Sequence, residues 1–189
     1  MRGRRARLLC GIAGPAAFVS AWAVGGIVKD GYSPVADTIS RLAEQGAPTQ
    51  PLMTAGFVGF GVLMPLFARQ LGRDLRSPGV TAAVTVSGLG TILVACFPLT
   101  RDGGAPIDTL HFLAAGTAYV ANVVAPLVAA RHLPSPVARR ASYAVAVAVA
   151  ACLAGSLVLA DQTGLLQRAG LTLFDAWAVT LAIRLLRRG

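Results

Sequence analysis

The sequence predicts an all-α membrane protein, with six transmembrane helices in a bundle and a short amphipathic helix in the first outer connection. Three observations carry this prediction. Hydrophobic residues make up 55% of the 189 residues and charged residues only 13%, which is about half the charged share typical of soluble domains. The mean hydropathy is +0.66. The charged residues are also grouped between long apolar runs.

Six apolar runs approach or reach the length that a bilayer requires of a helix, roughly 20 residues. They cover about 8–28, 52–68, 80–99, 107–130, 141–160 and 169–186, and we expect them to form a single transmembrane domain over residues 1–189. Arginines precede the first run, as in a signal peptide. That run is longer than the roughly 7–15 residues of a signal-peptide core, so we interpret it as a retained transmembrane helix.

The basic residues predict the orientation. If the N-terminus is cytoplasmic, 13 of the 17 Lys and Arg residues lie on the cytoplasmic side, and the outer side has Lys29, Arg41, Arg101 and Arg168. Membrane proteins show this excess of positive charge in cytoplasmic segments. We therefore expect a multi-pass protein of the cell membrane with both termini in the cytoplasm. We expect the basic residues that give the net charge of +9 to contact anionic lipid headgroups. We expect no nucleic-acid partner.

The connection 29–51 contains the predicted amphipathic helix. Ser33 and Pro34 form a typical helix start, and Gly46 is a typical stop. At helical spacing, an apolar face lies opposite a polar face: Val35, Ile39, Leu42 and Ala43 against Asp37, Ser40, Arg41 and Glu44. Asp37 and Arg41 are one turn apart, where an ion pair is expected. The segment is either a connector lying on the bundle or a lid over a site.

The fourth run, 107–130, carries a polar stripe. At about 100° per residue, its polar side chains fall on one face: Asp108, His111, Tyr119 and Asn122. Because polar groups are costly in hydrocarbon, this face should line the protein interior or a wet cavity. Asp175 lies inside the sixth run and should face the same cavity. For Asp175 we consider a salt bridge, with His111 across the bundle or with Arg168 on its own helix, and as the alternative a role in the site.

The spacing of Asp108 and His111 favours contact between their side chains. A carboxylate beside an imidazole suits general acid–base catalysis or proton relay, and the alternative is a histidine that serves helix packing. We therefore take His111 and Asp108 as candidate catalytic residues. The candidate ligand-binding residues are Tyr119, Asn122, Asp175, Tyr32, Asp37, Ser40 and Arg41.

Other chemistry has weaker support in the sequence. A nucleophile set of Ser33 or Ser40 with His111 and Asp108 has no spacing signature. The outer side offers one histidine and the three cysteines are scattered, so we expect no metal site and no cofactor.

Short motifs along the chain carry a family resemblance. They are 11–15, 31–34 with 37–42, 56–57 with Gly61, 97–98 with Asp102, His111, and 164–168. Together they resemble a bacterial and archaeal membrane family known as domain of unknown function 998. The resemblance covers nearly the whole chain and implies six spans, with no established activity. Residues 37–40 are also remotely similar to the first outer loop of the Frag1/DRAM/Sfk1 membrane proteins, which are implicated in lipid organisation and autophagy.

These observations favour a protein that binds a lipid or small amphiphile from the outer leaflet, in an outward-facing polar pocket beneath residues 32–44. One alternative is a membrane-embedded, hydrolase-like enzyme that uses His111 as general base and Asp108 to orient it. Another is a proton-coupled carrier. Membrane lipids are the expected partners, and the sequence specifies neither the ligand nor the oligomeric state.

Overall fold

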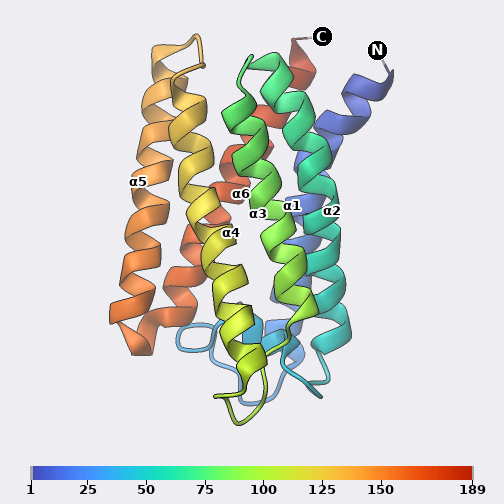
Figure 1. The fold of residues 1–189 in the computed structure, drawn as a ribbon, viewed down its shortest axis with the longest axis vertical. Coiled ribbons are helices and arrows are strands. Elements are labelled where there is room, and N and C mark those ends of the chain that lie inside the picture. The colour runs from blue at the N-terminus through green and yellow to red at the C-terminus, as the bar shows by residue number, and fades with distance from the viewer. Residues whose placement is uncertain (1, 189) are drawn as a thin grey trace.

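Six long helices form one bundle in the computed structural model, which describes residues 2–188 (Figure 1). The helices are α1 (Arg2–Val28), α2 (Gln50–Asp74), α3 (Pro78–Cys96), α4 (Pro106–Ala130), α5 (Pro136–Val158) and α6 (Thr163–Arg187). Within residues 2–188, each of the six is long and apolar enough to cross a membrane. The predicted six-helix membrane fold is confirmed.

The helix ends differ from the predicted spans for identifiable reasons. Most helices extend past the apolar runs, because arginine is a good helix former and continues a helix into the polar zone. Three helices begin with proline at the first position, and Ser77 and Ser135 cap two of them by accepting hydrogen bonds from Val80 N and Ala138 N. Helix α3 ends at Cys96, earlier than predicted, because a residue that precedes proline, here Phe97, disfavours the helical conformation.

The two ends of the bundle are chemically different. One end, here called the arginine-rich end, carries both termini and the α2–α3 and α4–α5 connections (Figure 1). The opposite end, the loop end, carries the connections 29–49, 97–105 and 159–162. The arginine-rich end holds the 13 basic residues that the sequence assigns to the cytoplasmic side. The orientation of the arginine-rich end toward the cytoplasm remains a prediction from the sequence.

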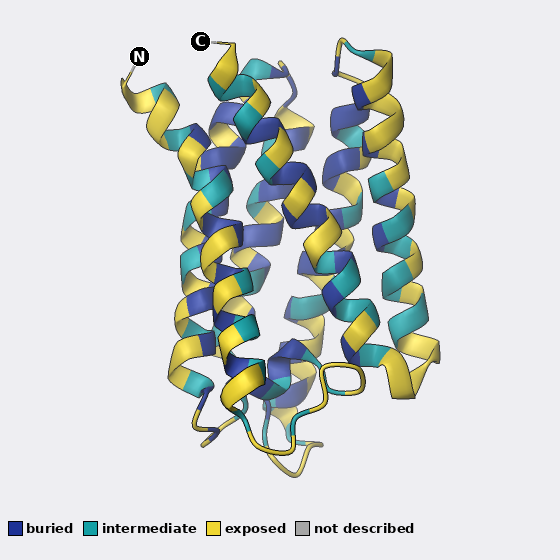
Figure 2. Ribbon diagram, turned by 180° about the vertical axis from the view of Figure 1, so that it is seen from behind, coloured by how far each residue is buried: buried dark blue, intermediate teal, exposed yellow. Residues whose placement is uncertain are grey.

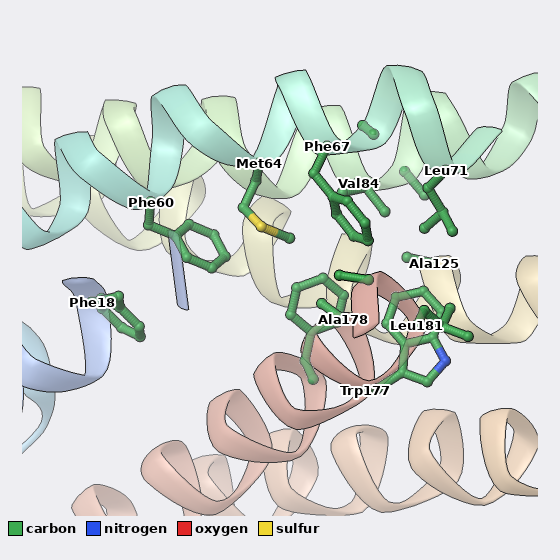
Figure 3. Packing of buried hydrophobic residues seen from close by; sticks show 14 of the residues in the cluster. Phe18, Phe60, Met64, Phe67, Leu71, Val84, Ala125, Trp177, Ala178 and Leu181 are labelled. Atoms are coloured by element: carbon green, nitrogen blue, oxygen red, sulfur yellow. The ribbon is translucent and has the colours of Figure 1, made fainter. Parts of the chain in front are cut away.

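Apolar side chains fill the centre of the bundle. Phe60, Met64, Phe67 and Leu71 follow one face of α2 and point toward residues of α1, α3, α4 and α6 (Figure 3). Helices α2 and α3 approach closely where both have glycine. A Cβ on Gly88 would lie only 2.7 Å from Cδ of Pro65, so the close contact requires the absence of a side chain there. Small residues commonly allow such contact between membrane helices.

The outer faces of the helices are also apolar. Buried residues face the bundle axis and exposed residues face outward (Figure 2). Large apolar side chains are among those exposed, including Phe112 and Leu113 at 64% and Leu157 at 80%. In a soluble protein such a surface is a liability, whereas in a bilayer it is the face that contacts lipid.

The first connection folds back into the loop end of the bundle. It contains a single 3₁₀ helix, η1 (Ile39–Ala43), which is shorter than the helix predicted from Ser33 to Gly46. Asp37 instead accepts a hydrogen bond from Ser33 N at 2.8 Å, and so the expected Asp37–Arg41 pair does not form. Of the predicted apolar face, Ile39, Leu42 and Ala43 are buried, whereas Val35 is 46% exposed.

Candidate functional site

His111 joins three separate parts of the loop end. Its Nδ1 lies 2.7 Å from the carbonyl oxygen of Phe97, and its Nε2 lies 2.8 Å from Oγ of Ser40 in η1. A carbonyl oxygen only accepts hydrogen bonds, so Nδ1 carries the hydrogen. In the neutral ring Nε2 is then an acceptor, and the Ser40 hydroxyl donates to it. The ring is only 1% exposed, so this arrangement is held within the bundle.

Asp108 does not bond to His111, contrary to the expectation from helical spacing. Its carboxylate accepts hydrogen bonds from Thr100 N at 2.8 Å, Thr100 Oγ1 at 2.7 Å and Ala105 N at 3.2 Å. Asp108 lies in the first turn of α4, where the helix dipole favours a carboxylate and the N–H of Ala105 at the helix start is free to donate, and the two bonds from Thr100 come from the preceding connection. Asp108 therefore fixes the 97–105 connection, and that connection supplies the Phe97 carbonyl to His111.

Asp175 faces a small cavity at the centre of the loop-end half, which we name the central cavity. Its volume is about 50 Å³. Four of the predicted site residues line it: Ser40, Tyr119, Asn122 and Asp175. Further lining comes from apolar and aromatic side chains, among them Phe18, Phe57 and Phe60. The structure thus brings polar groups from η1, α4 and α6 to the lining of one cavity.

The Asp175 carboxylate is the unusual group in this cavity. The residue is 4% exposed, and Oδ2 is the one buried side-chain nitrogen or oxygen atom within residues 2–188 that has no hydrogen-bond partner. The two expected partners are both engaged elsewhere, His111 with Ser40 and Arg168 with the first connection. Both predicted pairings of Asp175 are therefore wrong.

The other polar residues around the cavity have partners. Asn122 Oδ1 accepts a hydrogen bond from Ser87 Oγ, and the Tyr119 hydroxyl donates to the carbonyl of Gln167 at 3.2 Å. The Gln167 side chain accepts from Ile39 N at 2.7 Å. The Ile39–Gln167 bond holds η1 against α6, and Asp175 Oδ2 is the buried side-chain atom of the cavity lining that has no partner within residues 2–188.

The remaining predicted ligand-binding residues lie outside the central cavity. The Tyr32 hydroxyl bonds to the Arg168 guanidinium and donates to the carbonyl of Thr38 at 2.9 Å. Burial raises the pKa of Tyr32 and outweighs the nearby positive charge of Arg168. Asp37 caps the turn at Ser33, and Arg41 pairs with Glu44 at 3.2 Å. These three residues build the cover over the cavity and do not line it.

Sequence reasoning did not anticipate the role of Arg168. This side chain is 8% exposed and donates to the carbonyls of Pro34, Asp37 and Gly164 at 2.8, 2.9 and 2.9 Å. Its guanidinium also lies 5.6 Å from the centre of the Trp22 ring, a cation–π contact. The available signal was an arginine within the first two turns of an apolar helix, a position where a charge requires a partner.

The six apolar helices and the buried polar groups between them define a polytopic α-helical membrane protein. The chain matches the family model described as "Protein of unknown function (DUF998)" over residues 12–184, and it belongs to that family. This match does not show the likeness of residues 37–40 to the Frag1/DRAM/Sfk1 proteins. Neither the curated proteins nor the solved structures contain a match.

Proposed function

We propose that this protein binds a small amphiphile whose polar group is a positively charged amine, with the amine in the central cavity beside Asp175. The observation that carries the proposal is the unpartnered, buried Oδ2 of Asp175. Leaving a buried polar atom without a partner costs about 1–3 kcal/mol, and more when the group is charged. A ligand with N–H donors would offset that cost by hydrogen bonding to Oδ2, and this favours its binding in the cavity.

The walls of the cavity support a cation as the polar group. Phe18, Phe57 and Phe60 surround the space together with Tyr119. Aromatic faces attract ammonium groups, and the attraction is stronger where water is excluded. A volume of about 50 Å³ accommodates an ammonium group but not a whole lipid, since one water molecule occupies roughly 30 Å³ in the liquid. The apolar part of the ligand therefore stays in the bilayer or between helices.

Ester hydrolysis is a second candidate, and the Ser40–His111 hydrogen bond is the observation that favours it. A serine hydroxyl that donates to Nε2 of a histidine, with Nδ1–H held by an acceptor, is the arrangement of a nucleophile next to its general base. The acceptor here is a backbone carbonyl, and Ser40 is only 7% exposed. Amine binding gives the unpartnered carboxylate of Asp175 a function, whereas ester hydrolysis by Ser40 and His111 does not use it.

The binding proposal is tested by native mass spectrometry of the full chain in neutral detergent, with dodecylamine and dodecanol as the two probes. We expect dodecylamine to bind roughly tenfold or more tightly than dodecanol, as one charge-assisted hydrogen bond implies. Asp175→Asn should abolish that preference. Asp161→Asn, which alters an exposed carboxylate in the α5–α6 connection, is the matched control and should retain it. Equal binding of the two probes, or a preference unchanged in Asp175→Asn, would refute the proposal.

The same samples separate the two candidates. A fluorophosphonate probe labels serines that are activated by a neighbouring base. Labelling at Ser40 that disappears in both Ser40→Ala and His111→Gln would establish the hydrolytic function. Under the binding proposal, Ser40 stays unlabelled and Ser40→Ala keeps the preference for dodecylamine.

A further inference from the structure

A second and larger pocket lies at the arginine-rich end. Its volume is about 670 Å³, within the range of small-molecule sites. It lies between the end of α2, the α4–α5 connection and the end of α6. These segments are far from the central cavity, so a ligand in this pocket is independent of amine binding at Asp175.

Three arginines surround this pocket: Arg76, Arg184 and Arg188. Within residues 2–188, none of their guanidinium groups has an ion-pair or hydrogen-bond partner. The one carboxylate that lines the pocket, Asp74, already pairs with Arg4 at 3.1 Å and accepts a hydrogen bond from Gln70 at 2.9 Å. The pocket therefore has a surplus of positive charge that the protein itself leaves uncompensated.

The turn between α2 and α3 places Arg76 at the pocket. Arg76 has a φ of +51° and directly follows the C-cap of α2, Leu75. Ser77 N donates to the carbonyl of Gly72 at 2.8 Å, and Arg76 N donates to the carbonyl of Arg73 at 3.2 Å. These two bonds are those of a common helix end with a left-handed residue, so the helix end accounts for the backbone of Arg76, and its side chain lines the pocket.

The floor of the pocket is apolar. Leu71 is fully buried, Leu181 is 6% exposed and Leu133 is 8% exposed, and all three line the pocket beneath the arginines. A basic rim over an apolar floor, at the end of a transmembrane bundle, matches a molecule with an anionic head and an apolar body. Guanidinium groups bind phosphate oxygens in pairs, and basic pockets between transmembrane helices bind phospholipid headgroups.

We propose that this pocket binds the phosphate headgroup of an anionic phospholipid from the leaflet at the arginine-rich end, held by Arg76, Arg184 and Arg188. The phosphate lies among the three guanidinium groups, and the start of the acyl chains lies on the leucine floor. From the distribution of positive charge we predict that this leaflet is the cytoplasmic one. The site is thus distinct in both place and ligand charge from the cavity at Asp175.

The test compares lipid retention by native mass spectrometry, with phosphatidylglycerol and phosphatidylcholine as the two probes. The wild type should prefer phosphatidylglycerol. The triple variant Arg76→Gln/Arg184→Gln/Arg188→Gln should lose about tenfold or more of that preference, since each basic residue near an anionic membrane contributes substantially to the attraction. Because these side chains have no partners in the protein, the thermal stability of the lipid-free variant should equal that of the wild type.

A second triple variant, Arg5→Gln/Arg69→Gln/Arg73→Gln, is the matched control. It removes the same charge from residues of the same end that do not line the pocket. It should keep most of the preference for phosphatidylglycerol. An equal loss in both triple variants would mean general surface attraction and would overturn the proposal. Binding of inorganic phosphate that depends on the three pocket arginines, without any lipid preference, would also overturn it.

Discussion

Arg168 and Arg184 belong to the same helix, yet the two ends of the bundle use them in opposite ways. Arg168, at the loop end, is buried and donates to three backbone carbonyls. Arg184, at the arginine-rich end, lines an open pocket and has no partner within residues 2–188. The difference indicates that Arg168 stabilises the loop end from within, while the side chain of Arg184 is available to a molecule from outside the protein.

This comparison explains how the loop end protects a cavity within a membrane protein. Where the first connection packs against α6, Arg168 donates to two of its carbonyls, at Pro34 and Asp37. The Ser40–His111 and Ile39–Gln167 hydrogen bonds hold the adjoining segment from below. The cover over the central cavity is therefore fixed by long-range hydrogen bonds between elements distant in the sequence.

The largest expected effect is that of removing Arg168. Arg168→Ala should lower the free energy of unfolding by about 3 kcal/mol or more, because it removes a buried guanidinium that donates to two partly buried carbonyl oxygens and to the buried carbonyl of Gly164. Arg184→Ala should change it by less than about 0.5 kcal/mol, as expected of a surface side chain without partners. Thermal unfolding of both variants in the same detergent measures the difference. Equal losses at the two positions would contradict the contrast between the two ends.

A smaller effect is expected where α6 meets the first connection at Gly164. A Cβ at this position would collide with the backbone carbonyl groups of Asp37 and Pro34. Gly164→Ala should therefore cost about 1–3 kcal/mol, the usual penalty of overpacking, and should loosen the cover over the cavity. Gly116 is the control, since nothing lies within 4 Å of a Cβ there. Gly116→Ala should be neutral or stabilising by up to about 1 kcal/mol, and thermal unfolding checks both.

The sequence was sufficient to predict the six helices, and the reason is physical. A bilayer requires long apolar segments and places charge at their ends, so hydropathy and the distribution of arginine determine the elements almost directly. The polar stripe of α4 was also recognisable, because helical periodicity places Asp108, His111, Tyr119 and Asn122 on one side, and all four are buried.

The partners of these polar residues were not predictable in the same way. Helical spacing favoured an Asp108–His111 pair, but it does not include the competition from Ala105 N at the start of α4 and from Thr100 in the preceding connection, to which Asp108 bonds instead. The Ser40–His111 and Arg168–Pro34 contacts join residues far apart in the sequence. Which distant segments meet depends on the packing of the whole bundle, and no local pattern in one sequence records it.

The smallest expected effect is an acid-sensitive contact at the base of the first connection. Burial raises the pKa of Glu44, but its hydrogen bonds and ion pairs with Lys29 at 2.9 Å and Arg41 at 3.2 Å outweigh burial and hold the pKa below the ordinary value of 4.5. A carboxylate with a lowered pKa stabilises the folded state fully above its ordinary pKa and loses that contribution as the pH falls through the lowered value.

Glu44→Gln should therefore cost up to about 1 kcal/mol at pH 7. The stability difference between wild type and Glu44→Gln, measured by thermal unfolding, should vanish on acidification well below 4.5. Asp30→Asn alters a carboxylate of the same connection that has no ion pair within residues 2–188, and it should leave the stability at pH 7 unchanged. A difference between wild type and Glu44→Gln that grows on acidification would rule out the stabilising role of the Glu44 carboxylate.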